Sequence, residues 1–277
     1  MERNLENILP ILGVEQDCIL SKQGDVTIAF KAELPEIFTL CNADYEAFHQ
    51  TWIKAIKILP RHSVFHKQDW YIETKYKLNF KEDNQFLSRS SERFFNERPY
   101  LDHTCYIFIT KKPGNRKSAT SMMSGLLRKS IVPEQSMNKQ LLQEFYESCG
   151  QFERILKDSG FVQLNRLKEN ALMSTEDSAG VIEKYCFLLE NENTSTIKDI
   201  QFKDAFKIGD EHCQLYTLAD INDLPALCGS RINYDKYSTD KTKFSVAFTS
   251  ALGQLLPCSH IYNQFLFVDD VQKTGPV

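Results

Sequence analysis

Five cysteine and histidine side chains in the C-terminal part of the chain could supply soft ligands to a zinc ion. They are His212, Cys213, Cys228, Cys258 and His260. A strong zinc prediction needs cysteines in closely spaced pairs, and none of these has the Cys-x-x-Cys spacing. His62 and His66 would share one face of a strand, but two ligands are too few for a site. We therefore expect no metal and interpret the cysteines as buried free thiols.

Binding of a nucleoside triphosphate would need a glycine-rich loop around the phosphates, followed by Lys and Ser or Thr. None of the eleven glycines stands in that pattern, and the segment 124–130 lacks the second glycine. The run 265–270, Phe-Leu-Phe-Val-Asp-Asp, resembles the strand and acid that hold Mg²⁺ in nucleotide-binding folds. Without an upstream phosphate loop we interpret it as an ordinary strand leaving the core. No Gly-x-Ser-x-Gly elbow is present, so we expect neither a catalytic residue nor a cofactor.

The segment from Lys111 to Pro133 has the strongest local charge asymmetry, with six basic residues and no acid. Such a segment could neutralise phosphates or an acidic partner surface. It has no interleaved aromatic residues on which bases could stack, and a solvated loop is the alternative interpretation. The candidate contacts to a partner or to nucleic acid are Lys111, Lys112, Arg116, Lys117, Arg128 and Lys129.

Composition narrows the class of protein. The 277 residues are 42% hydrophobic and carry a net charge of −4, which predicts a packed core and gives no whole-molecule reason to bind nucleic acid or an anionic membrane. Eight evenly spread cysteines are typical of a reducing compartment. No window is apolar enough for a membrane span, and the acidic start is unlike a signal peptide. We expect a soluble, cytosolic protein.

Hydrophobic periodicity predicts the elements of the N-terminal half. Two alternating runs between Cys18 and Leu34 flank a turn at 23–25 and predict a hairpin. Apolar residues recur every three or four positions over 43–59, with Asn42 placed to cap a helix and Pro60 to stop it. Residues 62–76 alternate and are rich in β-branched and aromatic side chains, which predicts a strand.

A second helix is expected from Asp83 or Asn84 to Arg98, ended by Pro99, with its charged residues on a solvated face. Thr104–Thr110 has the composition of a buried central strand. The basic run over 111–135 then marks a possible internal boundary or a mobile insertion.

The second half of the chain repeats this mixture of elements. A long helix is predicted from Ser136 to a cap at Gly160, followed by a strand over 161–167. Residues 174–177 have the pattern of a cap for a short helix, and 201–270 is rich in β-prone residues. Hairpins mixed with helices favour an α+β fold with mostly antiparallel sheets, with a division into two subdomains as an open alternative.

Several strings resemble the N-terminal region of TraG-type ATPases of conjugative transposons, which belong to the type IV secretion ATPases. The resemblance extends over about residues 5–270. The strings that carry it are His66–Glu73, Phe86–Ser90, Phe95–Leu101, Phe152–Leu156, Asp158–Val162, Val181–Tyr185 and His260–Gln264.

The resemblance implies a role in assembly rather than in catalysis for residues 1–277. In that family the nucleotide-binding domain lies further toward the C-terminus, so ATP-binding roles transfer to no residue here. The implied partners are inner-membrane channel proteins of the transfer apparatus and other copies of the ATPase, at the cytoplasmic face of the inner membrane. Two alternatives remain: a DNA-binding accessory factor that uses segment 111–129, and a metal-assisted hydrolase that uses His212, Cys213, Cys258 and His260.

Overall fold

A computed structural model describes most of the chain. The described residues are 9–35, 41–76, 86–113, 139–175, 178–187, 198–218, 232–233, 243–244 and 258–269. They form an α+β fold in which every strand pair among the described residues is antiparallel; the sequence predicts mostly antiparallel sheets.

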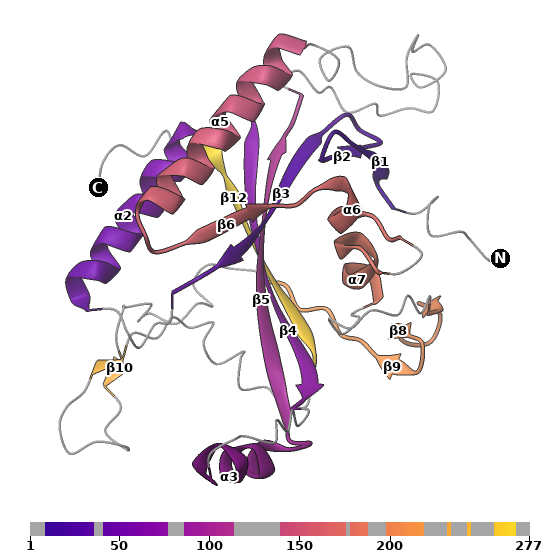
Figure 1. The fold of residues 1–277 in the computed structure, drawn as a ribbon. Coiled ribbons are helices and arrows are strands. Elements are labelled where there is room, and N and C mark those ends of the chain that lie inside the picture. The colour runs from indigo at the N-terminus through magenta and orange to yellow at the C-terminus, as the bar shows by residue number, and fades with distance from the viewer. Residues whose placement is uncertain are drawn as a thin grey trace.

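The main sheet has seven strands in the order β1-β2-β3-β5-β4-β12, with β6 also paired to β3. Its strands are β1 (Ile11–Glu15), β2 (Cys18–Ser21), β3 (Val26–Glu33), β4 (Ser63–Lys75), β5 (Pro99–Lys111), β6 (Gln163–Arg166) and β12 (His260–Phe267). β5 is central, as predicted for 104–110, but it is longer than predicted. Its 13 residues pair with all 13 residues of β4, so the two strands form one long hairpin (Figure 1).

The remaining elements are short strands and five described helices. The short strands are β7 (Ile200–Gln201), β8 (Lys207–Ile208), β9 (Glu211–His212), β10 (Ile232–Asn233) and β11 (Lys243–Phe244). The helices are α2 (Asn42–Ile58), α3 (Phe86–Phe95), α5 (Lys139–Asp158), α6 (Glu169–Leu172) and α7 (Val181–Phe187). In the part of the chain that the structure describes, no helix has the length and apolar character needed to cross a membrane.

Helices α2 and α5 lie side by side on one face of the main sheet (Figure 1). The apolar side chains of α5 recur at spacings of three and four residues, and Phe145, Cys149, Phe152 and Leu156 are each at most 1% exposed. The Phe152 ring centre lies about 6 Å from three others, in Phe30 of β3, Trp52 of α2 and Phe65 of β4. One aromatic side chain thus joins both helices to two strands.

The shorter helices α6 and α7 cover part of the other face. Trp70 and Tyr106 have ring centres 4.7 Å apart and share a buried cluster with Val181 of α7. Leu172 of α6 is fully buried against Ala29 of β3. The sheet is therefore covered on both faces near β3.

Several predicted boundaries are confirmed and others shift. Gly160 ends α5 with φ +74°, as predicted. The cap of α2 is Cys41 rather than Asn42, and its backbone N–H donates to the Asp44 carboxylate at 3.1 Å. α3 ends at Phe95, before the predicted Arg98, because Glu97 has φ +58°. The caps predicted at 83–84 and 136 lie outside the described residues.

Two glycines give a direct test of this packing. At Gly180, between α6 and α7, an added Cβ would lie 2.4 Å from the carbonyl carbon of Met173, whereas at exposed Gly150 on α5 it would meet nothing within 4 Å. Gly180→Ala should lower the free energy of unfolding by about 1–3 kcal/mol through overpacking. Gly150→Ala should raise it by up to about 1 kcal/mol through helix propensity. Urea unfolding of the whole chain measures both, and effects of the same sign would contradict the packing.

Candidate functional site

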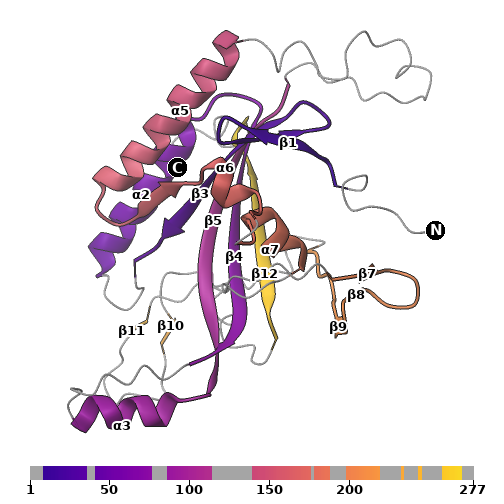
Figure 2. The same cartoon turned by 45° about the vertical axis from the view of Figure 1, so that its right-hand side comes forward.

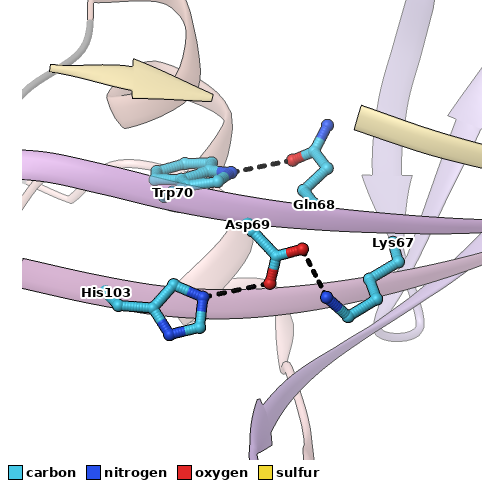
Figure 3. Close-up of polar contacts among 5 residues, drawn as sticks. All are labelled: Lys67, Gln68, Asp69, Trp70 and His103. Carbon is cyan, nitrogen blue, oxygen red and sulfur yellow. Dashed lines mark hydrogen bonds and ion pairs between the residues drawn. The ribbon is translucent and has the colours of Figure 1, made fainter. Parts of the chain in front are cut away.

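A buried carboxylate lies on the face of the β4–β5 hairpin that also carries Phe65. Asp69 is 4% exposed and stands opposite Cys105 on β5 and Tyr262 on β12. Its Oδ1 accepts a hydrogen bond from His103 Nε2 at 3.0 Å, and its Oδ2 forms an ion pair with Lys67 Nζ. Figure 3 shows both partners converging on the carboxylate from the two strands. We call Lys67, Asp69 and His103 the polar row.

The polar row keeps Asp69 charged. Burial is the largest single effect on this group and would raise its pKa, but it is outweighed by the hydrogen bond from His103 and the charge of Lys67. The pKa of Asp69 therefore lies below its ordinary value. A carboxylate that is both buried and ionised depends on these two partners.

The neighbouring row of the sheet is a stack of three rings. Tyr71 lies between His103 and His260, with ring centres 4.7 Å and 4.9 Å away and planes tilted by 22° and 20°. Burial, followed by the nearby charge of Asp69, raises the pKa of Tyr71 to about 12. Burial likewise raises the pKa of Cys105 to about 12. Both groups are held neutral, so neither is activated as a nucleophile.

A second polar cluster joins the ends of three strands. The Asp269 carboxylate accepts from the backbone N–H of His62 at 2.9 Å and lies 3.2 Å from its Nδ1. Lys112 N–H donates to the His62 carbonyl at 2.9 Å. These contacts hold His62 at φ +61° beside a cavity of about 280 Å³ that Ser63 also lines. The predicted acid at 269 thus serves as a strand-end clamp, and Asp270 lies outside the described residues.

Only two of the six predicted basic contacts fall on described residues. Lys111 is the last residue of β5, and its ammonium donates to the Arg61 carbonyl. Burial lowers the pKa of Lys111, although nearby acids oppose that shift. Lys112 N ζ lies 5.4 Å from the centre of the Phe267 ring. Arg116, Lys117, Arg128 and Lys129 lie outside the described residues, as does the predicted insertion beyond position 113.

The described members of the predicted metal site lie by two different sheets. His212 is the last residue of β9 and Cys213 follows it, while His260 is the first residue of β12 and Cys258 lies two residues before it. His260 Nδ1 lies 2.9 Å from the Cys258 carbonyl. Within the described ranges no cluster of three or more potential ligands is present, and Cys228 falls outside them. Of the described cysteines, Cys18, Cys105 and Cys149 are buried, whereas Cys41 and Cys258 are exposed.

Large apolar side chains are exposed in several parts of the described chain. Two of these groups lie on the β4–β5 hairpin and on β12, and sequence reasoning missed both as surfaces. One is the tip of the β4–β5 hairpin with α3, where Phe86 and Leu87 are 77% and 76% exposed. The other, which we call the β12 end, comprises Phe265, Leu266 and Phe267 at 62%, 37% and 52% exposure. A helical-wheel reading of 86–95 could have found the first group. The second group is exposed on the last strand of the sheet, and hydrophobic periodicity does not reveal the order of strands in a sheet.

Comparison with known proteins gives a match at the N-terminus. A family described as "Domain of unknown function, B. Theta Gene description (DUF3875)" matches residues 2–50. Of that stretch the structure describes β1, β2, β3 and the first part of α2. No curated protein matches the chain. The polar row and both apolar surfaces lie beyond the matched residues.

The polar row predicts a pH dependence of stability. Since the folded-state pKa of Asp69 is lowered, its ionised form stabilises the fold above the unfolded-state pKa of about 4. This contribution is lost as pH falls through the folded-state value. Asp69→Asn should lower the free energy of unfolding at pH 7 by about 1–3 kcal/mol and flatten its fall below pH ~5.

The matched control is Glu153→Gln, which removes a carboxylate from the surface pair with Lys157 at 2.7 Å. That pair should contribute less than about 1 kcal/mol. Urea midpoints collected between about pH 2 and 8 compare the two variants. If the free energy of unfolding falls equally at low pH in both variants, the partners of Asp69 do not lower its pKa.

Proposed function

We propose that this chain is the non-catalytic assembly and docking region of a conjugative DNA-transfer ATPase of the type IV secretion class. It contacts inner-membrane channel proteins and neighbouring copies of the ATPase at the cytoplasmic face of the membrane. The family strings between His66 and Gln264 support the identity of the system. The placement of apolar side chains supports the docking role.

The observation that carries the docking role is the β12 end. Strand β12 has the sequence His-Ile-Tyr-Asn-Gln-Phe-Leu-Phe, with no Lys, Arg, Asp or Glu, and it stands last in the strand order beside β4. Phe265 is 62% exposed even though its ring stacks on His66 at 4.0 Å. Phe267, two residues later, is 52% exposed. Natural edge strands usually carry charges that prevent association.

The composition of the β12 end fits a protein partner. Aromatic side chains are enriched and charged residues depleted in the centres of protein interfaces. The fixed pairing of Phe265 with His66 and of Phe267 with Val64 presents these rings on a preorganised strand, which reduces the entropy lost on binding. The β12 end can therefore seat an apolar surface of a channel component or of a neighbouring copy.

The alternative DNA-binding function has less support from the described residues. Phosphate contacts need exposed cations that are free to approach the backbone. Lys111 is instead half-buried and donates to the Arg61 carbonyl. Asp269 is a further source of negative charge near Lys111. The first residue of the basic segment, Lys111, therefore makes a structural contact. We rank the docking function above DNA binding for this reason.

The proposal predicts that β12 variants reduce DNA transfer. Phe265→Ser with Phe267→Ser removes both rings from the β12 end while keeping its strand pairing. Conjugation frequency, measured in a donor whose own copy of the gene is deleted, should fall about tenfold or more, as expected when interface anchors are lost. Affinity capture from the same cells should recover less of the channel proteins and of neighbouring copies.

The control is Leu12→Ser on β1, which is 50% exposed and far from β12 in the strand order. It should leave transfer unchanged at equal protein level. If the gene deletion itself leaves transfer intact, the conjugation role is wrong. If the double variant transfers DNA normally, the role can stand but the β12 end is not its docking surface.

A further inference from the structure

Helix α3 lies at the far end of the β4–β5 hairpin, away from the core. In Figures 1 and 2 it lies across the end of the two strands, remote from α2 and α5. Backbone hydrogen bonds hold the residues just after α3 against the end of β4: Tyr76 N–H donates to the Arg98 carbonyl at 3.3 Å, and Glu97 N–H donates to the Tyr76 carbonyl at 3.0 Å. The pairing of β4 with β5 continues without interruption to Lys75 and Pro99. The position of α3 at the end of the hairpin is therefore fixed by that pairing.

The helix is amphipathic, with an apolar half that faces no core. At about 3.6 residues per turn, Phe86, Leu87, Phe94 and Phe95 share one half of its circumference with the small residues Ser90 and Ser91. Ser88, Arg89, Glu92 and Arg93 share the other half. No residue of α3 is buried. The four apolar side chains are between 50% and 77% exposed. This is the reverse of the usual arrangement, in which such a stripe covers a core.

Residues of the hairpin extend the apolar half beyond the helix. Tyr76 and Tyr100 are 36% and 44% exposed at the ends of the strands. The ring centres of Phe95 and Tyr76 lie 6.4 Å apart, and both residues line a cavity of about 370 Å³ together with Tyr100. The Arg98 guanidinium lies 3.6 Å from the centre of the Phe94 ring. We call the four apolar residues of α3 with Tyr76 and Tyr100 the tip surface.

The charge beside the tip surface is opposite to that of the whole chain. Residues 86–100 contain three arginines and two glutamates, a net charge of +1 (3 − 2), whereas the chain carries −4. Arg89 and Arg93 are both exposed on the polar half of α3. Aromatic and leucine side chains with arginines along the flank are the composition of helices that lie in the headgroup region of a bilayer.

We propose that the tip surface is a membrane-surface anchor, and that α3 lies flat on a bilayer containing anionic lipids. Phe86, Leu87 and Phe94 enter the boundary between headgroups and acyl chains, while the arginines contact lipid phosphates. A groove on a protein would accept a narrow stripe at i, i+3, i+4 and i+7. Here two adjacent apolar pairs and two tyrosines form a broad surface instead. The anchor goes beyond the docking role of β12 and does not depend on it.

The first test is sedimentation of the full chain with vesicles. One set contains equal parts phosphatidylethanolamine and phosphatidylglycerol, and the other contains phosphatidylcholine alone. The chain should bind the anionic set, and added salt should weaken that binding. Phe86→Ser with Leu87→Ser should reduce the bound fraction about tenfold or more, because each apolar side chain removed loses several buried methylene groups. Arg89→Glu with Arg93→Glu should abolish the preference for anionic vesicles.

The matched control is Leu215→Ser with Tyr216→Ser, at two adjacent apolar positions that are each 84% exposed elsewhere in the chain. It should bind like the wild type. All variants change exposed side chains, so their thermal unfolding midpoints should agree with that of the unaltered chain. Failure of the wild type to sediment with either vesicle set, or equal binding by the tip and control variants, would overturn the proposal.

A second measurement reports on insertion itself. The natural tryptophans, Trp52 and Trp70, lie in the packed clusters of the body, so Phe94→Trp adds a reporter at the tip. Its emission should shift to the blue on addition of anionic vesicles. If the emission does not shift, α3 does not enter the bilayer and the lipid assignment is wrong. If the tip variants keep full vesicle binding but lose a protein that cross-links to the wild type, α3 is instead a protein contact.

Discussion

The pairing of β4 with β5 is the constraint on which the rest of the structure depends. It runs in one register, without a bulge, from Ser63 opposite Lys111 to Lys75 opposite Pro99. A shift of one residue would exchange the two faces of each strand. Phe65 would then leave the α2–α5 core, and Asp69 would lose His103. The core, the polar row and the projecting end of the hairpin therefore all depend on the same β4–β5 register.

The polar row lies between the end of the hairpin that belongs to the core and the end that projects from it. Ile107 and Ile109 are fully buried beneath the helices, whereas Tyr100 near the other end is 44% exposed. Asp69 lies between these regions and is still buried. An ionised group at such a depth needs specific partners with good geometry. His103 and Lys67 supply them from both strands, which favours the observed register over a shifted one.

Local patterns in the sequence were sufficient for elements with strong periodicity. The apolar spacing over 43–59 predicted α2 within about one residue, and Gly160 was correctly predicted to end α5. Sequence alone could not place Asp69 beside His103, because that contact requires the pairing of residues 34 positions apart. The sequence likewise placed Asp269 at the end of a strand, but it could not show that this carboxylate contacts His62, which is 207 positions away. Long-range pairings determine both sites, and periodicity carries no information about them.

The same hairpin sets the distance between the two proposed contact surfaces. Phe267 of β12 stands opposite Val64, near the start of β4, while α3 lies beyond Lys75 at its end. Thirteen residues at about 3.3 Å each span roughly 40 Å. A paired antiparallel arm resists bending better than a linker of equal length, so a membrane contact at the tip would fix the height of the β12 end above the bilayer. If both proposed contacts form, this rigid spacing would hold the partner of β12 at a set distance from the membrane.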